Sequence, residues 1–281
     1  MSTRRDLIGA GLGMGLLGAQ KVFAQQPPAG QAQPANQDAS GFLRGLAGRG
    51  GRGEPVPVRQ GKITKLFKSP EGYPNAIALS KEGWWIAEQK SDHACLVDWD
   101  GKLLKTVKTE SKNTSGMGYG GGYIWMAANA APQGIFQTDL NGRTVSHRQI
   151  PLGGGGCHGA MYVDGKLWIA ALRLRGILRV DATTWEPEYI IPYAVPRAHA
   201  TAWDNGAIWL VTGSDEGAGL IKYDAATSRP LEVVKFAERY PDPHGLAIKD
   251  GVMYTCDAGI HPGWPDDISP AHGYICRIDI A

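Results

Sequence analysis

A repeated pattern of about 40 residues constrains this chain more than any other feature of its sequence. Each copy begins with a short run led by a polar or small residue, and an aromatic residue follows ten positions later. Successive copies start 40, 43, 41 and 45 residues apart, which is the length of one four-stranded propeller blade. The five first residues are Asn75, Ser115, His158, His199 and His244.

Each copy continues in the same way after its aromatic residue. A third short run ends in aspartate, at Asp98, Asp139, Asp181, Asp224 and Asp279. In two copies this aspartate is followed by Asp100-Gly101 or Asn141-Gly142, residue pairs that tolerate the positive φ of a tight hairpin. A fourth run then leads out of the unit. The repeat therefore predicts an all-β fold, a five-bladed β-propeller.

The two ends of the repeat region predict how the ring closes. The fifth copy stops at Ala281 after its third run, and an unpaired strand-like segment, residues 62–67, precedes the first copy. We expect this N-terminal strand to complete the last blade, because closure removes exposed sheet edges. A sixth blade would have to lie within residues 25–60, whose composition argues against it.

Composition and charge agree with one propeller domain over residues 62–281. The chain is 43 % hydrophobic, and its 39 glycines and 9 tryptophans suit short strands joined by tight turns. With 29 basic and 27 acidic residues the net charge is only +2, so the chain lacks the basic field that nucleic acids attract. We expect a monomer whose partner is a small molecule and not a nucleic acid.

Residues 1–24 predict an export signal. Arg4 and Arg5 precede an apolar run at 9–19, and small residues ending at Ala24 suit signal peptidase. The twin arginines favour the twin-arginine route, with an ordinary secretion signal as the alternative. The apolar run is too short to span a bilayer, so we predict no membrane span and a periplasmic or secreted protein.

Residues 25–61 are rich in Pro, Gln, Gly and Arg and predict a flexible linker without a core. Its arginines at 44, 49 and 52 are interpreted as solvated, with contact to lipid headgroups as the alternative.

Four cysteines, at 95, 157, 256 and 276, follow the predicted signal. An oxidising compartment permits disulfides, and Cys256 and Cys276 fall on neighbouring strands of one predicted blade. The alternative is free buried thiols. No pair has the spacing of a zinc ribbon.

The first residues of the repeat are the candidate site. In a propeller the first strand of each blade lines the axis, so equivalent residues converge. His158, His199 and His244 are predicted to hold a divalent metal ion, and Glu88 and Asp257 are predicted to ligate it or to orient a histidine. Two alternatives stay open: neutral histidines that act in catalysis or ligand binding, and histidines that only cap strands around a channel.

Other polar and aromatic residues are expected at the rim of the same face. Arg173 is the candidate for contacting an anion or a carbonyl oxygen. The fifth copy carries an insertion at 258–272, which we expect to lie over the channel mouth. Predicted substrate or rim contacts are Asn75, Ser115, Asn129, Gln89 and Trp264.

Three segments resemble the repeat of the virginiamycin B lyase family and, more broadly, the gluconolactonase and NHL propellers: 243–247 (PHGLA), 73–78 (YPNAIA) and 85–88 (WIAE). The likeness covers residues 63–281. It implies a propeller that opens cyclic esters by elimination or hydrolysis with a divalent metal in its channel. By this resemblance His244 is the candidate base, and Glu88 is a metal ligand or base.

The resulting hypothesis is an exported, metal-dependent hydrolase or lyase that acts on a small ester or lactone. The metal would polarise the carbonyl or activate water, Glu88 or Asp257 would move the proton, and Arg173 would stabilise negative charge. The alternative is a non-catalytic propeller that binds a ligand or a protein. An electron-transfer protein ranks last, because the chain lacks a CxxCH haem motif.

Overall fold

The computed structural model describes residues 56–195, 197–214, 217–236, 242–259 and 269–281. These residues form strands and one short 3-10 helix, η1(Pro151–Gly153). The predicted export signal, most of the predicted linker, Trp264 and the middle of the insertion lie outside the described residues. Within the described ranges, no helix is long and apolar enough to cross a membrane.

Three antiparallel sheets of four strands follow one another along the chain, each in sequential strand order. Their strands are β2(Pro74–Leu79), β3(Trp84–Glu88), β4(His93–Val97), β5(Leu103–Lys108), β6(Thr114–Gly120), β7(Tyr123–Ala128), β8(Gly134–Thr138), β9(Thr144–Arg148), β10(Cys157–Val163), β11(Lys166–Ala171), β12(Gly176–Asp181) and β13(Pro187–Pro192). Each sheet is one copy of the sequence repeat.

The remaining strands form one eight-stranded sheet in the order β14-β15-β16-β17-β1-β20-β19-β18. Their bounds are β14(Arg197–Asp204), β15(Ala207–Ser214), β16(Gly217–Asp224), β17(Pro230–Phe236), β18(Pro243–Lys249), β19(Val252–Asp257), β20(Tyr274–Ile280) and β1(Val58–Lys68). β1 runs antiparallel to β20, from Gly61 opposite Ile280 to Lys68 opposite Tyr274. Segment 62–67 therefore lies beside the last strand of the fifth repeat.

β1 also makes a pairing that the sequence did not predict. Its first residues, from Val58 to Gly61, run parallel to β17, with Val58 opposite Val233 and Gly61 opposite Phe236. The strand thus begins four residues before the predicted domain start at residue 62. The repeat offers no signal for this contact, because β1 belongs to the segment before the first copy.

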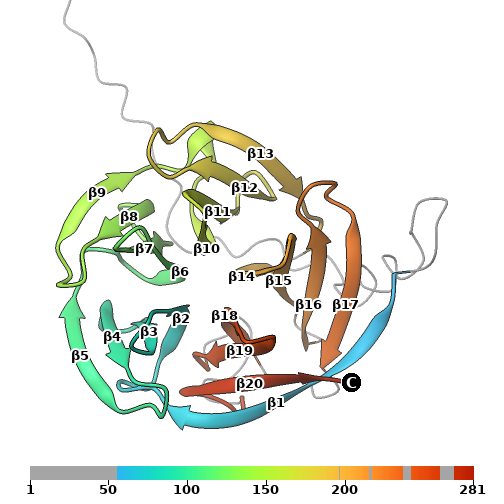
Figure 1. Ribbon diagram of the computed structural model, residues 1–281, viewed down its shortest axis with the longest axis horizontal. Coiled ribbons are helices and arrows are strands. Elements are labelled where there is room, and N and C mark those ends of the chain that lie inside the picture. Colours follow the sequence, from blue (N-terminus) through green and yellow to red (C-terminus); the bar gives the residue numbers. More distant parts are fainter. Residues whose placement is uncertain (1–55, 196, 215–216, 237–241, 260–268) are drawn as a thin grey trace, which may run out of the picture. The chain divides into compact units, whose positions relative to one another are not determined.

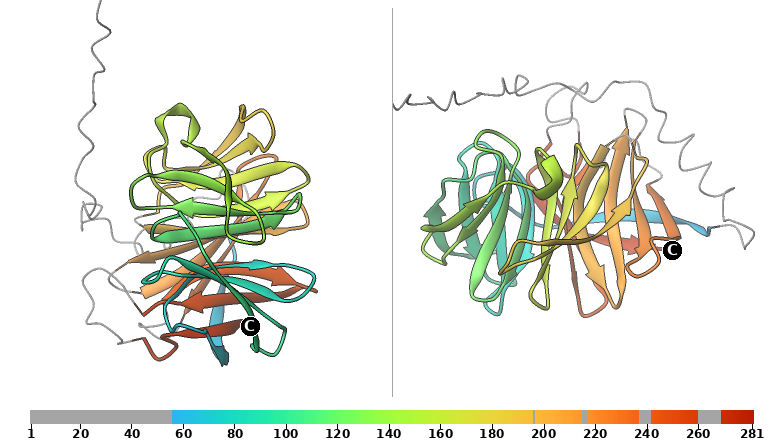
Figure 2. Two further views of the ribbon diagram at one scale, coloured as in Figure 1. Left: turned by 90° about the vertical axis from the view of Figure 1, so that its left-hand side faces the viewer. Right: turned by 90° about the horizontal axis from the view of Figure 1, so that it is seen from above.

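The sheets lie around a common centre in a propeller-like arrangement (Figure 1). The first strand of each repeat lies innermost, and β5, β9, β13, β17 and β1 lie outermost. In the right-hand view of Figure 2, turned by 90° about the horizontal axis from Figure 1, the strands run through the thickness of the ring of sheets. The starting ends of β10, β14 and β18 lie close together, since the ring centroids of His158 and His199, and of His199 and His244, are each 4.5 Å apart.

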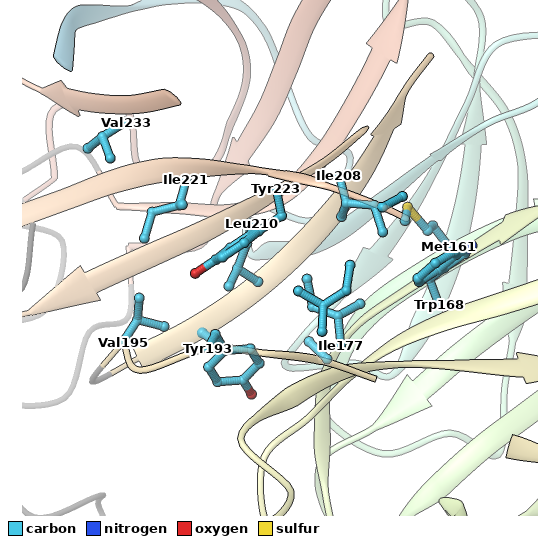
Figure 3. Packing of buried hydrophobic residues seen from close by; sticks show 14 of the residues in the cluster. Met161, Trp168, Ile177, Tyr193, Val195, Ile208, Leu210, Ile221, Tyr223 and Val233 are labelled. Carbon is cyan, nitrogen blue, oxygen red and sulfur yellow. The ribbon is translucent and has the colours of Figure 1, made fainter. Parts of the chain in front are cut away.

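Among the described residues the core consists of five apolar clusters: four lie between adjacent sheets, and the fifth lies between the β14–β17 half and the β18–β20 half of the eight-stranded sheet. Figure 3 shows the cluster between β10–β13 and β14–β17, which includes Met161 and Trp168 on one side and Ile208 and Leu210 on the other. The aromatic residue of each repeat belongs to a different cluster, which explains its regular recurrence. These residues are Trp85, Trp125, Trp168, Trp209 and Tyr254.

The aspartates that end the third strands organise the following turns. The Oδ1 atom of Asp98 accepts backbone N–H groups from Asp100 and Lys102, and Asp139 does the same two and four residues on. Gly101 and Gly142 each have φ of +88°, as the hairpin pattern predicted. These aspartates therefore hold turns and do not contribute to the axial site.

All four cysteines are buried free thiols. Cys256 lies opposite Ile275, whereas Cys276 lies opposite Thr255, so the two thiols are offset by one residue across β19 and β20. Successive side chains of a strand point to opposite faces, which puts Cys256 and Cys276 on different faces of the sheet. The possible Cys256–Cys276 disulfide is therefore wrong for this fold.

The close contact between β1 and β17 yields a stability prediction at Gly61. A methyl group added there would lie 2.7 Å from Val234 Cγ1 and 2.8 Å from the Phe236 ring. We expect Gly61→Val to lower the free energy of unfolding by about 1–3 kcal/mol through overpacking, although valine favours strands.

The matched control is Lys62→Val, one residue along the same strand at an exposed position. Urea unfolding followed by tryptophan fluorescence measures both variants. Equal stability of the two would contradict the packing of β1 against β17.

Candidate functional site

A bulge or register shift interrupts each inner strand at the first position of the repeat. The shifts fall between Pro74 and Ala76, Thr114 and Gly116, Cys157 and Gly159, Ala198 and Thr201, and Pro243 and Leu246. A bulge redirects the side chain of its extra residue out of the regular alternation. The five side chains that share this position, here called the ring, are Asn75, Ser115, His158, His199 and His244.

The inner strands approach one another closely behind the ring. A methyl group added at Gly116 would lie 2.5 Å from the backbone nitrogen of Ala160, and one at Gly159 would lie 2.8 Å from the carbonyl oxygen of His199. A methyl group added at Gly245 would lie 2.7 Å from the backbone nitrogen of Ile77. Glycine after the ring residue therefore lets neighbouring backbones meet, and this brings the ring side chains within contact distance.

The three predicted histidines lie together. The ring centroids of His158 and His199 are 4.5 Å apart and nearly stacked, and those of His199 and His244 are 4.5 Å apart in an edge arrangement. The convergence that the repeat predicted is thus present, with imidazoles in direct contact.

His158 is held as a neutral imidazole by two neighbours. Its Nδ1 donates to the carbonyl oxygen of Ala198 at 2.9 Å, and its Nε2 accepts from the amide of Asn129 at 2.8 Å. Burial lowers the pKa of His158 to about 4, and the charge of Arg197 lowers it as well. Asn129, predicted as a rim residue, therefore contacts the site directly.

His244 is neutral for a geometric reason. Its Nδ1 donates to the carbonyl oxygen of Asp242 at 2.8 Å, and its Nε2 lies 3.1 Å from Arg197 Nη2. Because an arginine can only donate, Nε2 of His244 must carry the lone pair. Arg197 Nη1 also donates to Asp242 Oδ1 at 2.6 Å, and the carboxylate of this pair is 1 % exposed.

Sequence reasoning missed Arg197 and Asp242. Both stand two residues before a ring histidine, His199 and His244 respectively, so the repeat position was available as a signal. The other copies carry different residue types there, and the repeat alone did not single out this position. These two residues supply the buried ion pair of the site.

Glu88 and Asp257 are buried but bind backbone rather than the histidines. The Glu88 carboxylate accepts N–H groups of Tyr73 at 2.9 Å and Glu71 at 3.2 Å. Asp257 accepts the N–H groups of Asp242 at 3.0 Å and Gly259 at 2.8 Å. Each carboxylate thus fixes the loop that leads into its own inner strand.

Burial raises the pKa of both carboxyl groups. For Glu88 the pKa is raised despite the two backbone hydrogen bonds. For Asp257 burial and the neighbouring charge of Asp242 raise it to about 7, and the Ser269 hydroxyl donates to the same carboxylate. Because the Asp257 carboxylate also accepts the backbone N–H of Asp242, one hydrogen bond connects it to the Arg197–Asp242 ion pair.

The remaining predicted rim residues divide into two groups. Asn75 is 1 % exposed and donates to Ser115 Oγ at 3.1 Å, while Gln89 donates to Asn113 Oδ1 at 2.9 Å. Arg173 is exposed and donates to the carbonyl oxygen of Gly153 at 3.3 Å. Trp264 lies outside the described residues.

The described residues do not fit the predicted metal site as they are arranged. Both ring nitrogens of His158 and of His244 take part in hydrogen bonds, and the Glu88 and Asp257 carboxylates bind backbone N–H groups. A metal ligand must offer a free lone pair. Among the residues described, no group of three or more His, Cys, Asp or Glu side chains is placed to hold a metal ion.

The raised pKa of Asp257 predicts a pH-dependent stability. The native carboxyl keeps its proton to higher pH than an unfolded aspartate, whose pKa is near 3.8, so its contribution to stability is present at low pH and is lost as pH rises toward 7. Relative to Asp257→Asn, the wild type should lose up to about 4 kcal/mol of unfolding free energy between pH 4 and pH 8.

Urea unfolding at several pH values measures this difference. The control is Asp250→Asn, which alters an exposed aspartate in the turn after β18 and should leave the pH slope unchanged. A constant stability difference between wild type and Asp257→Asn would contradict the prediction.

Comparison with known proteins shows a shared fold. No protein-family model and no curated protein matches the sequence. Glutaminyl cyclase of Myxococcus xanthus matches at 11 % identity over 81 % of this chain and 98 % of its own, with a TM-score of 0.59. Virginiamycin B lyase of Staphylococcus aureus matches at 18 % over 76 % and 69 % (TM-score 0.47), and a streptogramin B lyase at 14 % over 79 % and 98 % (0.48). The likeness to the glutaminyl cyclase shows a shared β-propeller-like fold.

Proposed function

We propose that the protein is an exported, five-bladed propeller enzyme that opens a small ester or lactone, by hydrolysis or elimination, at the ring. The observation that carries this proposal is the contact between neutral His244 and Arg197. A lone pair on an imidazole nitrogen and a guanidinium lie 3.1 Å apart beside two further histidines. A base next to a fixed positive charge is the pair of groups that ester cleavage needs.

The two groups have distinct proposed roles. Arg197 carries five N–H donors, two of which contact Asp242 and His244. A substrate carbonyl oxygen can accept the Arg197 Nη2–H that otherwise faces His244. Nε2 of His244 is then free to accept a proton. In hydrolysis the proton comes from the attacking water and passes to the leaving oxygen. In elimination it comes from the carbon next to the one that bears the leaving carboxylate.

Asp242 and Asn129 are positioning residues in this proposal. The buried Asp242 carboxylate holds the Arg197 guanidinium, and its backbone carbonyl fixes the Nδ1–H tautomer of His244. Asn129 fixes the same tautomer in His158. Arg173, at the exposed rim, is proposed to attract an anionic part of the substrate.

The architectural part of the proposal is a ring of five blades closed by β1, and it is supported by five copies of the repeat and by the pairing of β1 with β20. Export is supported by the sequence of residues 1–24. The divalent metal predicted from the sequence is not part of this proposal, because hydrogen bonds occupy the Nε2 lone pairs of His158 and His244, and no step above depends on it.

A second candidate function is a non-catalytic propeller that binds a ligand or a protein. Two ring side chains donate to the backbone of the next inner strand, Asn75 to Thr114 O at 2.8 Å and His158 to Ala198 O at 2.9 Å. Such bonds join adjacent sheets and favour a structural role for these two positions.

Substitution at the pair tests the enzymatic proposal. A panel of γ- and δ-lactones and p-nitrophenyl esters identifies the best substrate. On that substrate His244→Gln and Arg197→Lys should each lower kcat/KM by about 100-fold, since one loses the base and the other the planar guanidinium. His147→Gln, at an exposed histidine of β9, is the matched control and should retain activity.

Absence of turnover over the whole panel with folded protein would sink the enzymatic proposal and favour the binding propeller. Circular dichroism checks that each variant is folded.

Removal of metal gives an independent test of the hydrogen-bonded histidines. We expect dialysis against EDTA to change turnover by less than about twofold, because His158 and His244 lack free lone pairs. The readouts are turnover and metal content by inductively coupled plasma mass spectrometry. Stoichiometric metal that is lost in His199→Ala would instead restore the metal-dependent hypothesis.

A further inference from the structure

The part of the ring formed by β2 and β6 carries amides and a hydroxyl in place of imidazoles. Asn75 Nδ2 lies 2.8 Å from the carbonyl oxygen of Thr114 and 3.1 Å from Ser115 Oγ. A carbonyl oxygen only accepts hydrogen bonds, so the amide nitrogen of Asn75 must face Thr114. Its oxygen, Oδ1, therefore points elsewhere.

Two amide oxygens in this part are buried without a hydrogen-bond donor among the described residues: Asn75 Oδ1 and Gln89 Oε1. Both amides meet at Asn113, because Gln89 Nε2 and Asn75 Nδ2 lie 2.9 Å and 3.5 Å from Asn113 Oδ1. Leaving a buried acceptor unpaired costs about 1–3 kcal/mol. Two unpaired amide oxygens on side chains that share the acceptor Asn113 are an unusual cost for a fold to bear without a ligand.

The charges nearby favour a neutral donor. The carboxylate of Glu88 accepts two backbone N–H groups, and Asp92 accepts Asn113 N and pairs with Lys112. An ammonium group buried here would lack a free countercharge, which makes its desolvation costly. A hydroxyl or an amide N–H meets the need of a neutral amide oxygen without this penalty.

We infer that Asn75 Oδ1 and Gln89 Oε1 form a subsite for a neutral O–H or N–H donor carried by the ligand. The subsite lies on β2 and the loop after β3, whereas Arg197 begins β14, which is not adjacent to β2 in the ring. The inference rests on the proposed function, which supplies the ester or lactone as the group that reacts. The substrate class is then an ester or lactone that bears a hydroxyl or amide substituent on the side away from the group that Arg197 contacts.

A matched series of lactones tests this subsite. The probes are α-hydroxy-γ-butyrolactone and α-acetamido-γ-butyrolactone, each compared with its O-methyl or N-methyl derivative, which removes the donor at nearly constant size. Affinity by isothermal titration calorimetry and kcat/KM are both measured. We expect at least one donor-bearing probe to be favoured over its methylated partner by about tenfold, the value of one hydrogen bond.

Gln89→Met tests the residue assignment, because methionine keeps the length of the side chain and removes the oxygen. We expect the preference for the donor to fall below about threefold in this variant. Gln137→Met is the control, since the Gln137 oxygen already accepts from the Ser146 hydroxyl outside the ring. Asn75→Leu is a second variant, with folding checked by circular dichroism.

The outcomes separate this inference from the proposed function. Turnover of the probes without discrimination between hydroxy and methoxy, or acetamido and N-methyl, overturns the subsite and leaves the enzyme proposal standing. Donor-dependent binding without turnover supports the subsite and overturns the enzyme proposal. A preference that Gln89→Met and Asn75→Leu both retain overturns the assignment to these oxygens.

Discussion

The close approach of the inner strands at the axis is the constraint on which the rest of the structure depends. Gly116, Gly159 and Gly245 have neighbouring backbone where any other residue would place its Cβ. Because the inner-strand backbones are in contact, the ring side chains, which the bulges turn toward the axis, lie close to one another. The imidazoles of His158, His199 and His244 consequently touch each other and are not spread around a wide channel.

This crowding determines the chemistry of the histidines. Because each imidazole is largely removed from water, it relies on protein groups for hydrogen bonds, and a backbone carbonyl accepts the Nδ1 proton of both His158 and His244. Nε2 then carries the lone pair in each ring. Arg197 lies beside one of these lone pairs and is held by the buried Asp242. The site is therefore a neutral base next to a fixed cation, and β2, the inner strand next to β18, carries the neutral amide oxygen of Asn75.

The sequence predicted the positions of the site better than their roles. Glu88 and Asp257 were predicted as metal ligands or proton carriers because both end a second strand at the expected face. Their carboxylates instead bind backbone N–H groups of the loops before β2 and β18. A carboxylate at this repeat position could bind a metal ion or backbone N–H groups. The path of the loop before the inner strand decides which of these partners it contacts. Asp242 was missed because it belongs to that irregular loop.

By itself the sequence determined the four-stranded unit, the inter-sheet aromatic residues, the hairpin turns at Gly101 and Gly142, and the ring positions. These features follow from local periodicity, which strand geometry imposes on every copy alike. Only the tertiary structure decided the parallel pairing of β1 with β17, the separate faces of Cys256 and Cys276, and the donor or acceptor state of each histidine nitrogen. These features depend on contacts between residues far apart in the chain. Shifting the pairing of two strands by one residue would move a side chain to the other face of the sheet, and such a shift does not change the periodic pattern of the sequence.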